Sequence, residues 1–248
     1  MSNENSDVNS LRLKFLGPVA ESAGATLRDL WDLLFGPFGD YVERKRTSRL
    51  KDLNAFKDSL EEKVAAIPES RLCEPSLSVI GPALEASKYH YEEEKIREMF
   101  ANLIAASMDS QTKNAVHPSF SEIIKQMSAL DAKTLAVFSG ALPIAEYRLL
   151  IPDDSFITLM RDIFLDNPAE TNLELQAQSI SSLCRHGLIE TSYDKWLTQE
   201  GLYDKFAKTD LFLNLKNEYG SSENKLTVQN GMAYLTPLGE NFKAICVG

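Results

Sequence analysis

The segment from Tyr91 to Ser110 carries the feature that most constrains the fold, an apolar stripe with helical spacing. The apolar residues of the stripe recur at i, i+3, i+4, i+7 and i+8: Ile96, Met99, Phe100, Leu103 and Ile104. Acidic residues precede the stripe, where the helix dipole favours negative charge. The alanines beside this stripe have small side chains, so other helices can approach closely. We therefore expect a helix with one buried face inside a helical bundle.

Similar stripes flank this segment. Residues 16–34 and 53–67 each show apolar side chains three and four positions apart, and Gly or Pro ends each run. Residues 117–127 predict a further short helix. A helical bundle is therefore predicted over residues 11–128, after a disordered polar tail at residues 1–10.

The second half of the chain, residues 129–248, has a different pattern, which predicts a winged-helix-like domain. The expected order is three helices, a strand, a hairpin and a closing helix, at residues 131–142, 152–165, 172–187, 188–191, 225–236 and 236–246. The hairpin rests on Asn230-Gly231, a strong turn signal, and the closing helix on a Thr236 N-cap followed by Pro237. Residues 192–225 are expected to be an insertion containing another helix. The predicted fold class is mainly α, with an N-terminal helical bundle followed by a winged-helix-like C-terminal domain with a small β-hairpin.

Winged-helix domains often bind DNA, but the charge of this chain argues against that use. The 248 residues carry a net charge of −10, whereas a phosphate backbone requires basic partners. The helix expected to enter the major groove, residues 172–186, has Arg185 as its one fixed positive charge. Nucleic acid is therefore not the expected partner, and a winged-helix DNA-binding regulator is kept as the alternative function.

The most basic stretch follows the first stripe, and it is a candidate contact for an anion such as nucleic acid or a membrane surface. Its candidate residues are Arg44, Lys45, Arg46 and Arg49. Acidic residues are interspersed with these cations, which favours the interpretation of a solvated helix face.

A membrane role is open through residues 15–39, the most apolar region of the chain. Charged residues interrupt this region, and a spanning helix requires about 20 mostly apolar residues. Two alternatives therefore remain for this helix: it packs in the core of the bundle, or it leaves the bundle and inserts into a membrane.

Motifs for chemistry are missing from the sequence. The three histidines are isolated, and neither a metal-binding spacing nor a Gly-rich phosphate loop is present. A metal-dependent nuclease built on Asp153, Asp154 and Glu174 would lack its downstream lysine. We expect no enzyme, no catalytic residue, no metal and no cofactor. The three separated cysteines and the polar N-terminus lead us to expect a cytoplasmic protein with reduced thiols.

Four stretches of the sequence resemble the Abi-alpha family, which is named for abortive infection. They are "IPE" (67–69), "EPSLSVIGPALEA" (74–86), "IREMFANLIAASMD" (96–109) and "HPSFSEIIKQMSALDA" (117–132). The stretch "YLTPLGENF" near the C-terminus also fits, so the resemblance covers most of residues 30–246. It implies a role in bacterial defence against phage, in which an infected cell halts or dies, and it brings no catalytic residues.

Polar residues inside these motifs are the candidate site. They are Arg97, Glu98, Asn102, Asp109 and His117. Because buried polar groups must be paired, we favour a hydrogen-bond network joining the bundle to the winged helix over a partner or ligand contact. The predicted function is a non-enzymatic component of anti-phage defence that acts through protein–protein contacts, with a partner protein or another copy of itself.

Overall fold

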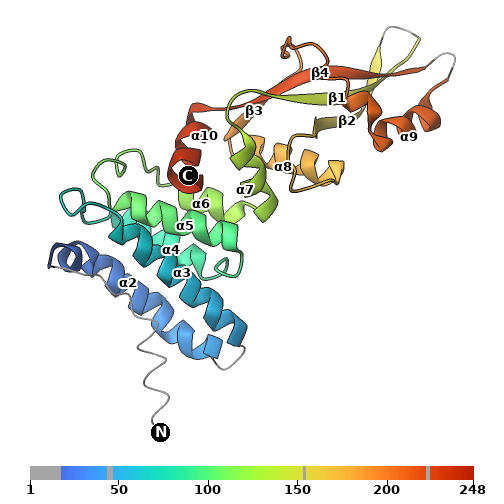
Figure 1. Cartoon of the computed structure of the whole chain (residues 1–248). Helices are drawn as coiled ribbons and strands as arrows, with labels where there is room; N and C mark the ends of the chain where they lie inside the picture. Colours follow the sequence, from blue (N-terminus) through green and yellow to red (C-terminus); the bar gives the residue numbers. More distant parts are fainter. Residues whose placement is uncertain (1–17, 44–46, 153–154, 222–223) are drawn as a thin grey trace. The chain divides into compact units, whose positions relative to one another are not determined.

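The computed structural model describes residues 18–43, 47–152, 155–221 and 224–248 (Figure 1). Side chains are described for residues 24–36 and, with the same gaps, from residue 50 onward. The tail predicted at residues 1–10 lies outside the described residues. The chain divides into two compact units, Met1–Ala129 with Asn241–Gly248, and Leu130–Glu240. We refer to them as the helical unit and the sheet unit.

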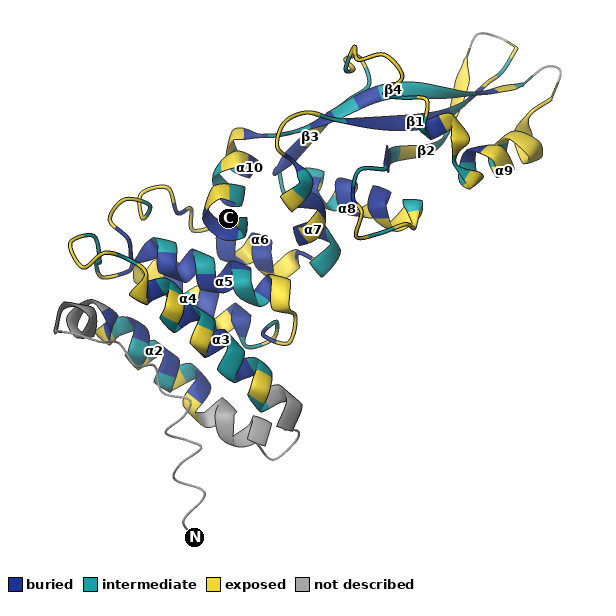
Figure 2. Cartoon of the chain, viewed as in Figure 1, coloured by how far each residue is buried: buried dark blue, intermediate teal, exposed yellow. Residues whose placement is uncertain are grey.

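The helical unit is built around one central helix. Its elements are α2 (Pro18–Glu43), α3 (Thr47–Ala65), α4 (Leu77–Ser87), α5 (Glu94–Ser107), α6 (Phe120–Gln126) and the C-terminal turn η2 (Lys243–Val247). Helix α5 contacts α3, α4, α6 and η2. The stripe predicted from Ile96 to Ile104 is buried along α5 (Figure 2). The prediction of a helix with one buried face is therefore confirmed.

Aromatic packing joins α2 to α3. Trp31 and Phe35 on α2 are both buried, and their ring centroids lie 4.4 Å apart. Phe56 on α3 lies 5.4 Å from Trp31 and 6.2 Å from Phe35. The apolar residues that motivated the membrane version thus form part of a bundle core. No described helix combines the length and the apolar character that a membrane crossing requires.

The sheet unit is organised by a four-stranded antiparallel sheet. Its elements are α7 (Ala129–Val137), β1 (Leu142–Leu150), β2 (Phe156–Phe164), α8 (Leu173–Arg185), β3 (Ile189–Ser192), η1 (Phe206–Lys208), α9 (Asp210–Tyr219), β4 (Lys225–Leu235) and α10 (Pro237–Phe242). The unit boundaries fall after the first residue of α7 and before the last two residues of α10. The strand order is β2-β1-β4-β3, and the sheet curves as half a barrel. The face that carries Tyr147 packs against η1 and α9, because Tyr147 and Phe212 are buried together with ring centroids 5.0 Å apart. We call this face the core face.

The fold-class prediction is wrong, because this sheet replaces the expected winged helix. Residues 152–165 were predicted to be helical from apolar spacings of three and four, yet they contain β2. Two register irregularities against β1 each give β2 an extra residue. As a result, Leu159, Met160 and Ile163 all join the core cluster. A strand with two bulges therefore reproduces the spacing of a helix.

The predicted hairpin is also absent, because Asn230 and Gly231 lie inside the continuous strand β4. Gly231 is paired with Ile144 of β1. A Cβ atom at Gly231 would lie 2.6 Å from the Tyr193 ring and 2.7 Å from the Ser192 carbonyl oxygen. Glycine is required here because the backbone and ring of residues 192 and 193 approach closely. The Asn-Gly pair therefore does not form the predicted turn.

Two helix starts in this unit agree with the prediction, at residues 172 and 236, whereas the helix predicted over residues 131–142 ends at Val137 and Leu142 begins β1. Asn172 caps α8 and accepts hydrogen bonds from the backbone of Glu174 and Leu175. Thr236 accepts a hydrogen bond of 2.9 Å from the Gly239 N–H, and Pro237 is the first residue of α10, as predicted.

Candidate functional site

The candidate residues from the motifs lie in the helical unit, and Asp109 has the strongest contact among them. Arg71 binds the Asp109 carboxylate through two nitrogens, with Nε 3.0 Å from Oδ1. The hydrogen bond from Arg71 lowers the pKa of Asp109. Backbone hydrogen bonds run beside this ion pair, from Cys73 N–H to the Met108 carbonyl and from Ser110 N–H to the Arg71 carbonyl. The pair thus fixes the chain that leads into α4 against the end of α5.

Two neighbouring residues of α5 bind α3 and the preceding turn. Glu98 accepts a hydrogen bond from Ser59 (2.8 Å) and pairs with Lys63 (3.1 Å). Arg97 donates to the Tyr91 carbonyl oxygen at 3.0 Å. These contacts position helices within the bundle.

The other two candidates make local or terminal contacts. The Asn102 side chain donates to the Cys246 carbonyl oxygen at 2.8 Å, which attaches the C-terminal turn to α5. His117 Nδ1 lies 2.7 Å from Ser119 Oγ, at the start of α6. Among the described residues, no side-chain hydrogen bond links one of the five candidates to another. A role for them in partner contact stays a prediction.

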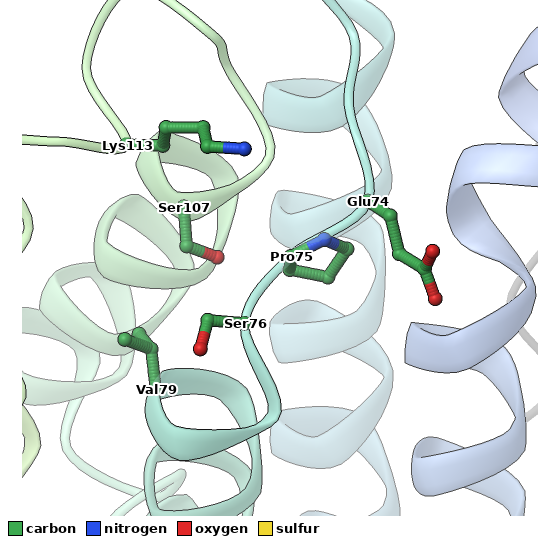
Figure 3. Close-up of a pocket in the computed structure, with 6 residues that line it drawn as sticks. All are labelled: Glu74, Pro75, Ser76, Val79, Ser107 and Lys113. Carbon is green, nitrogen blue, oxygen red and sulfur yellow. The ribbon is translucent and has the colours of Figure 1, made fainter.

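A pocket of about 230 Å³ lies beside the motif that begins at Glu74 (Figure 3). The lining residues are Glu74, Pro75, Ser76, Val79, Ser107 and Lys113. Figure 3 shows the Glu74 carboxylate pointing away from Lys113, and it accepts a hydrogen bond of 2.5 Å from Thr26. Ser107 Oγ donates to the Ile104 carbonyl oxygen at 2.6 Å. The Glu74 carboxylate and the Ser107 hydroxyl are thus both engaged within the helical unit.

A second cluster, which sequence reasoning missed, lies on the sheet unit. Alternation along β1 places Glu146 and Arg148 on the face opposite the core face. Glu146 is buried, with 2% of its surface exposed. Its Oε2 lies 2.7 Å from Nε and 2.6 Å from Nη2 of Arg148, and its Oε1 lies 2.7 Å from Nε of Arg161 on β2. One buried carboxylate therefore holds two guanidinium groups.

Aromatic rings flank both guanidinium groups. The Arg148 guanidinium lies 4.3 Å from the centre of the Phe156 ring, and its Nη1 donates to Gln229 at 3.2 Å. The Arg161 guanidinium lies 5.3 Å from the centre of the Tyr193 ring. Stacking on rings and binding through Nε restrict the orientation of each guanidinium plane.

Tyr193 closes one end of the cluster by a reciprocal contact with Asp162. The Tyr193 hydroxyl donates to Asp162 Oδ1 at 2.8 Å and accepts from the Asp162 N–H at 2.9 Å. Asp162 has a φ of 55°, a left-handed backbone conformation at the bulge of β2. Burial, with the Asp162 charge as a second cause, raises the pKa of Tyr193, so the phenol stays protonated at neutral pH.

These side chains surround an open cleft of about 410 Å³, which we call the arginine cleft. The lining residues are Glu146, Arg148, Phe156, Thr158, Arg161, Thr191, Ser192, Tyr193 and Asp194. They come from β1, β2, the end of β3 and the residues after it. The alternation of "IAEYRLL" in β1 was the sequence signal for this strand, since every second residue from Ala145 to Leu149 enters the core.

The other candidates cannot be assembled into a site. Arg44, Lys45, Arg46 and the side chain of Arg49 lie outside the described residues, as do Asp153 and Asp154. Within the described ranges, no group of three or more His, Cys, Asp and Glu side chains is placed to hold a metal ion.

Comparison with known proteins identifies the class. Residues 48–246 match the model of the family described as Abortive infection alpha. The chain belongs to this family, which confirms the resemblance inferred from the motifs and gives it a function related to abortive infection. No curated protein and no solved structure matches the chain.

Proposed function

We propose that this protein is a cytoplasmic, non-enzymatic component of anti-phage defence, and that it acts by binding another protein through the arginine cleft. The family supports the link to abortive infection. The observation that carries the binding role is the composition of the cleft, which combines arginines with exposed apolar side chains. Arginine and aromatic residues are enriched where protein interfaces gain most of their affinity.

The apolar part of this surface lies at the end of the cleft. Leu150 and Phe156 are paired across β1 and β2, and 38% and 48% of their surfaces are exposed. A large apolar side chain gains free energy when a partner removes it from water. The pair is therefore suited to anchor a partner that also reaches the arginines.

The chemistry of the cleft favours binding over catalysis. Its buried carboxylate is already held by two guanidinium groups, so Glu146 is a poor general base. Tyr193 keeps its proton because its pKa is raised, so it is a poor nucleophile. The polar groups of the cleft are thus arranged to hold a ligand in place.

A phage-infection assay tests this proposal. Cells that express the wild-type chain should form fewer plaques than cells without it, and the double variant Leu150→Ser, Phe156→Ser should restore plaque formation. Leu33→Ser is the matched control, because Leu33 is also a leucine with 68% of its surface exposed but lies on α2 of the helical unit. This control should protect as the wild type does.

Two results would contradict the proposal. Full protection by the double variant, at the same cellular protein level, would remove the cleft from the function. A wild-type chain that protects against no phage of a broad panel would remove the defence role itself.

A further inference from the structure

The orientation of Arg161 follows from the irregular pairing of β2. Arg148 is paired with Thr158 and Ala145 with Ile163, so Arg161 and Asp162 fall in the stretch of β2 that contains the extra residues. The left-handed conformation of Asp162 ends this bulge. Bulges redirect side chains, and this one brings Arg161 Nε to the carboxylate of Glu146.

The two guanidinium groups differ in how much binding capacity they retain. Arg148 uses all three nitrogens, two on Glu146 and one on Gln229, and 21% of its side chain is exposed. Arg161 uses Nε on Glu146 and stacks on Tyr193, while 63% of its side chain is exposed. Because Nε is bound to Glu146 and the side chain is largely exposed, we infer that the two terminal nitrogens of Arg161 form a fork that a ligand can reach.

An anion is attracted by the orientation of this fork and not by the net charge around it. Glu146 and Asp162 carry two negative charges against the two guanidinium groups, and the hydrogen bonds that Tyr193 and Ser181 donate to Asp162 leave its charge in place. Asp194 also lines the cleft, but it is exposed, so solvent and salt screen its charge. A carboxylate placed on the fork would form two parallel charge-assisted hydrogen bonds.

The surroundings of the fork determine which carboxylate fits. Phe156 and Leu150 offer an apolar contact on the same face of the sheet. Thr158 and Ser192, which also line the cleft, carry hydroxyls that can bond to peptide groups. A polypeptide supplies all three contacts, namely a carboxylate, an apolar side chain and backbone amides.

We propose that the arginine cleft binds an acidic side chain of a partner polypeptide, with its carboxylate on the terminal nitrogens of Arg161 and a neighbouring apolar side chain on Phe156. This inference rests on the proposed function, because it specifies the chemistry of the partner that the cleft takes. It assigns Arg161 as the residue that selects for the acidic group.

The test uses the full chain and three defined probes: a blocked peptide of alternating Glu and Leu, its counterpart with Gln for Glu, and inorganic phosphate. The Glu peptide should bind and shift the Arg161 Nε–H signal in a nitrogen-correlated NMR spectrum. The Gln peptide should bind on the order of 10-fold more weakly, because it forms no charge-assisted pair.

Two variants separate the fork from general electrostatics. Arg161→Lys keeps the positive charge but loses the fork, and it should weaken Glu-peptide binding on the order of 10-fold. Lys195→Gln removes a nearby exposed cation that does not line the cleft, and it should leave binding unchanged. Circular dichroism of each variant, compared with that of the wild type, shows whether the fold is retained.

Several outcomes would overturn this inference. In the first, the Glu and Gln peptides bind equally, and in the second, Arg161→Lys binds the Glu peptide as tightly as the wild type does. In the third, Lys195→Gln weakens Glu-peptide binding as much as Arg161→Lys does, and in the fourth, the chain binds phosphate but not the Glu peptide. The plaque assay with Leu150→Ser, Phe156→Ser remains a separate readout. If that double variant abolishes protection while Arg161→Lys binds the Glu peptide normally, the acidic specificity fails and the proposed function stands.

Discussion

The helical unit and the sheet unit use their charged side chains in opposite ways. In the helical unit, the polar residues of the family motifs hold parts of the chain together, as Asp109 does through Arg71 and Asn102 through the Cys246 carbonyl. In the sheet unit, Glu146 holds two arginines, and one of them, Arg161, keeps 63% of its side chain exposed. The polar motif residues therefore make contacts within the helical unit, whereas the surface that we propose for binding lies in the sheet unit.

This difference has a physical basis in the two architectures. Helices bury one stripe each, and their remaining polar groups are close enough to pair between neighbouring helices. A curved sheet covered on one face by helices leaves its other face open, and alternation brings polar side chains from several strands onto that face.

Gly239→Ala is expected to disrupt the sheet unit most strongly. A Cβ atom at this position would overlap the carbonyl oxygen of Leu188. The clash cannot be relieved by a side-chain rotation, because the oxygen belongs to the backbone and the position of Cβ is fixed by it. The expected loss is about 3 kcal/mol of unfolding free energy or more, as for other severe steric conflicts. Chemical denaturation measures it. Gly140→Ala, where an added Cβ meets nothing within 4 Å, should leave the unfolding free energy unchanged. Equal effects of the two substitutions would contradict the close approach at Leu188.

Glu146→Ala should cause the next largest loss of stability. The substitution leaves Arg148, with 21% of its side chain exposed, without its buried carboxylate. Breaking a fully buried pair costs about 3–5 kcal/mol, and we expect about 2 kcal/mol here because both arginines reach solvent. Thermal unfolding checks the value, and Glu190→Ala on β3, where the residue is exposed, is the control. A loss no larger than that of the control would show that the cluster contributes nothing to folding.

Apolar stripes along helices and signals at two helix starts predicted the structure well, while signals within strands, including the Asn230-Gly231 pair, did not. The α5 stripe and the Thr236-Pro237 start are local, and both are present in the structure. The spacing in residues 152–165 was ambiguous, because bulges in β2 imitate a helix. The arginine cleft depends on the register of β1 against β2 and on the path of Tyr193 across Gly231. Neither could be derived from the sequence, because each depends on contacts between residues that are far apart in it.

Tyr193→Phe should loosen one end of the arginine cleft at a modest cost. The substitution keeps the ring beside Arg161 but removes both hydrogen bonds between the hydroxyl and Asp162. A typical hydrogen bond contributes about 1 kcal/mol, and we expect a loss of that order in denaturant unfolding. Amide hydrogen exchange at Asp162 should also become faster than in the wild type. Tyr234→Phe, which removes an exposed hydrogen bond to Glu190, is the control and should have a smaller effect. Unchanged exchange at Asp162 would argue against the reciprocal contact.

Asp109→Asn should have the smallest effect, and pH reveals it. The hydrogen bond from Arg71 holds the pKa of folded Asp109 below its ordinary value of 3.8. The ionised carboxylate therefore stabilises the folded chain fully above about pH 4, and this contribution falls as the pH drops through the lowered pKa. The stability difference between wild type and Asp109→Asn should thus be constant near neutral pH and shrink in acid. Because Arg71 reaches solvent, salt should reduce the difference as well. A stability difference that stays constant from neutral pH into acid would mean that the Asp109 carboxylate does not stabilise the chain entering α4. The comparison between the two units would then lose its evidence from the helical unit.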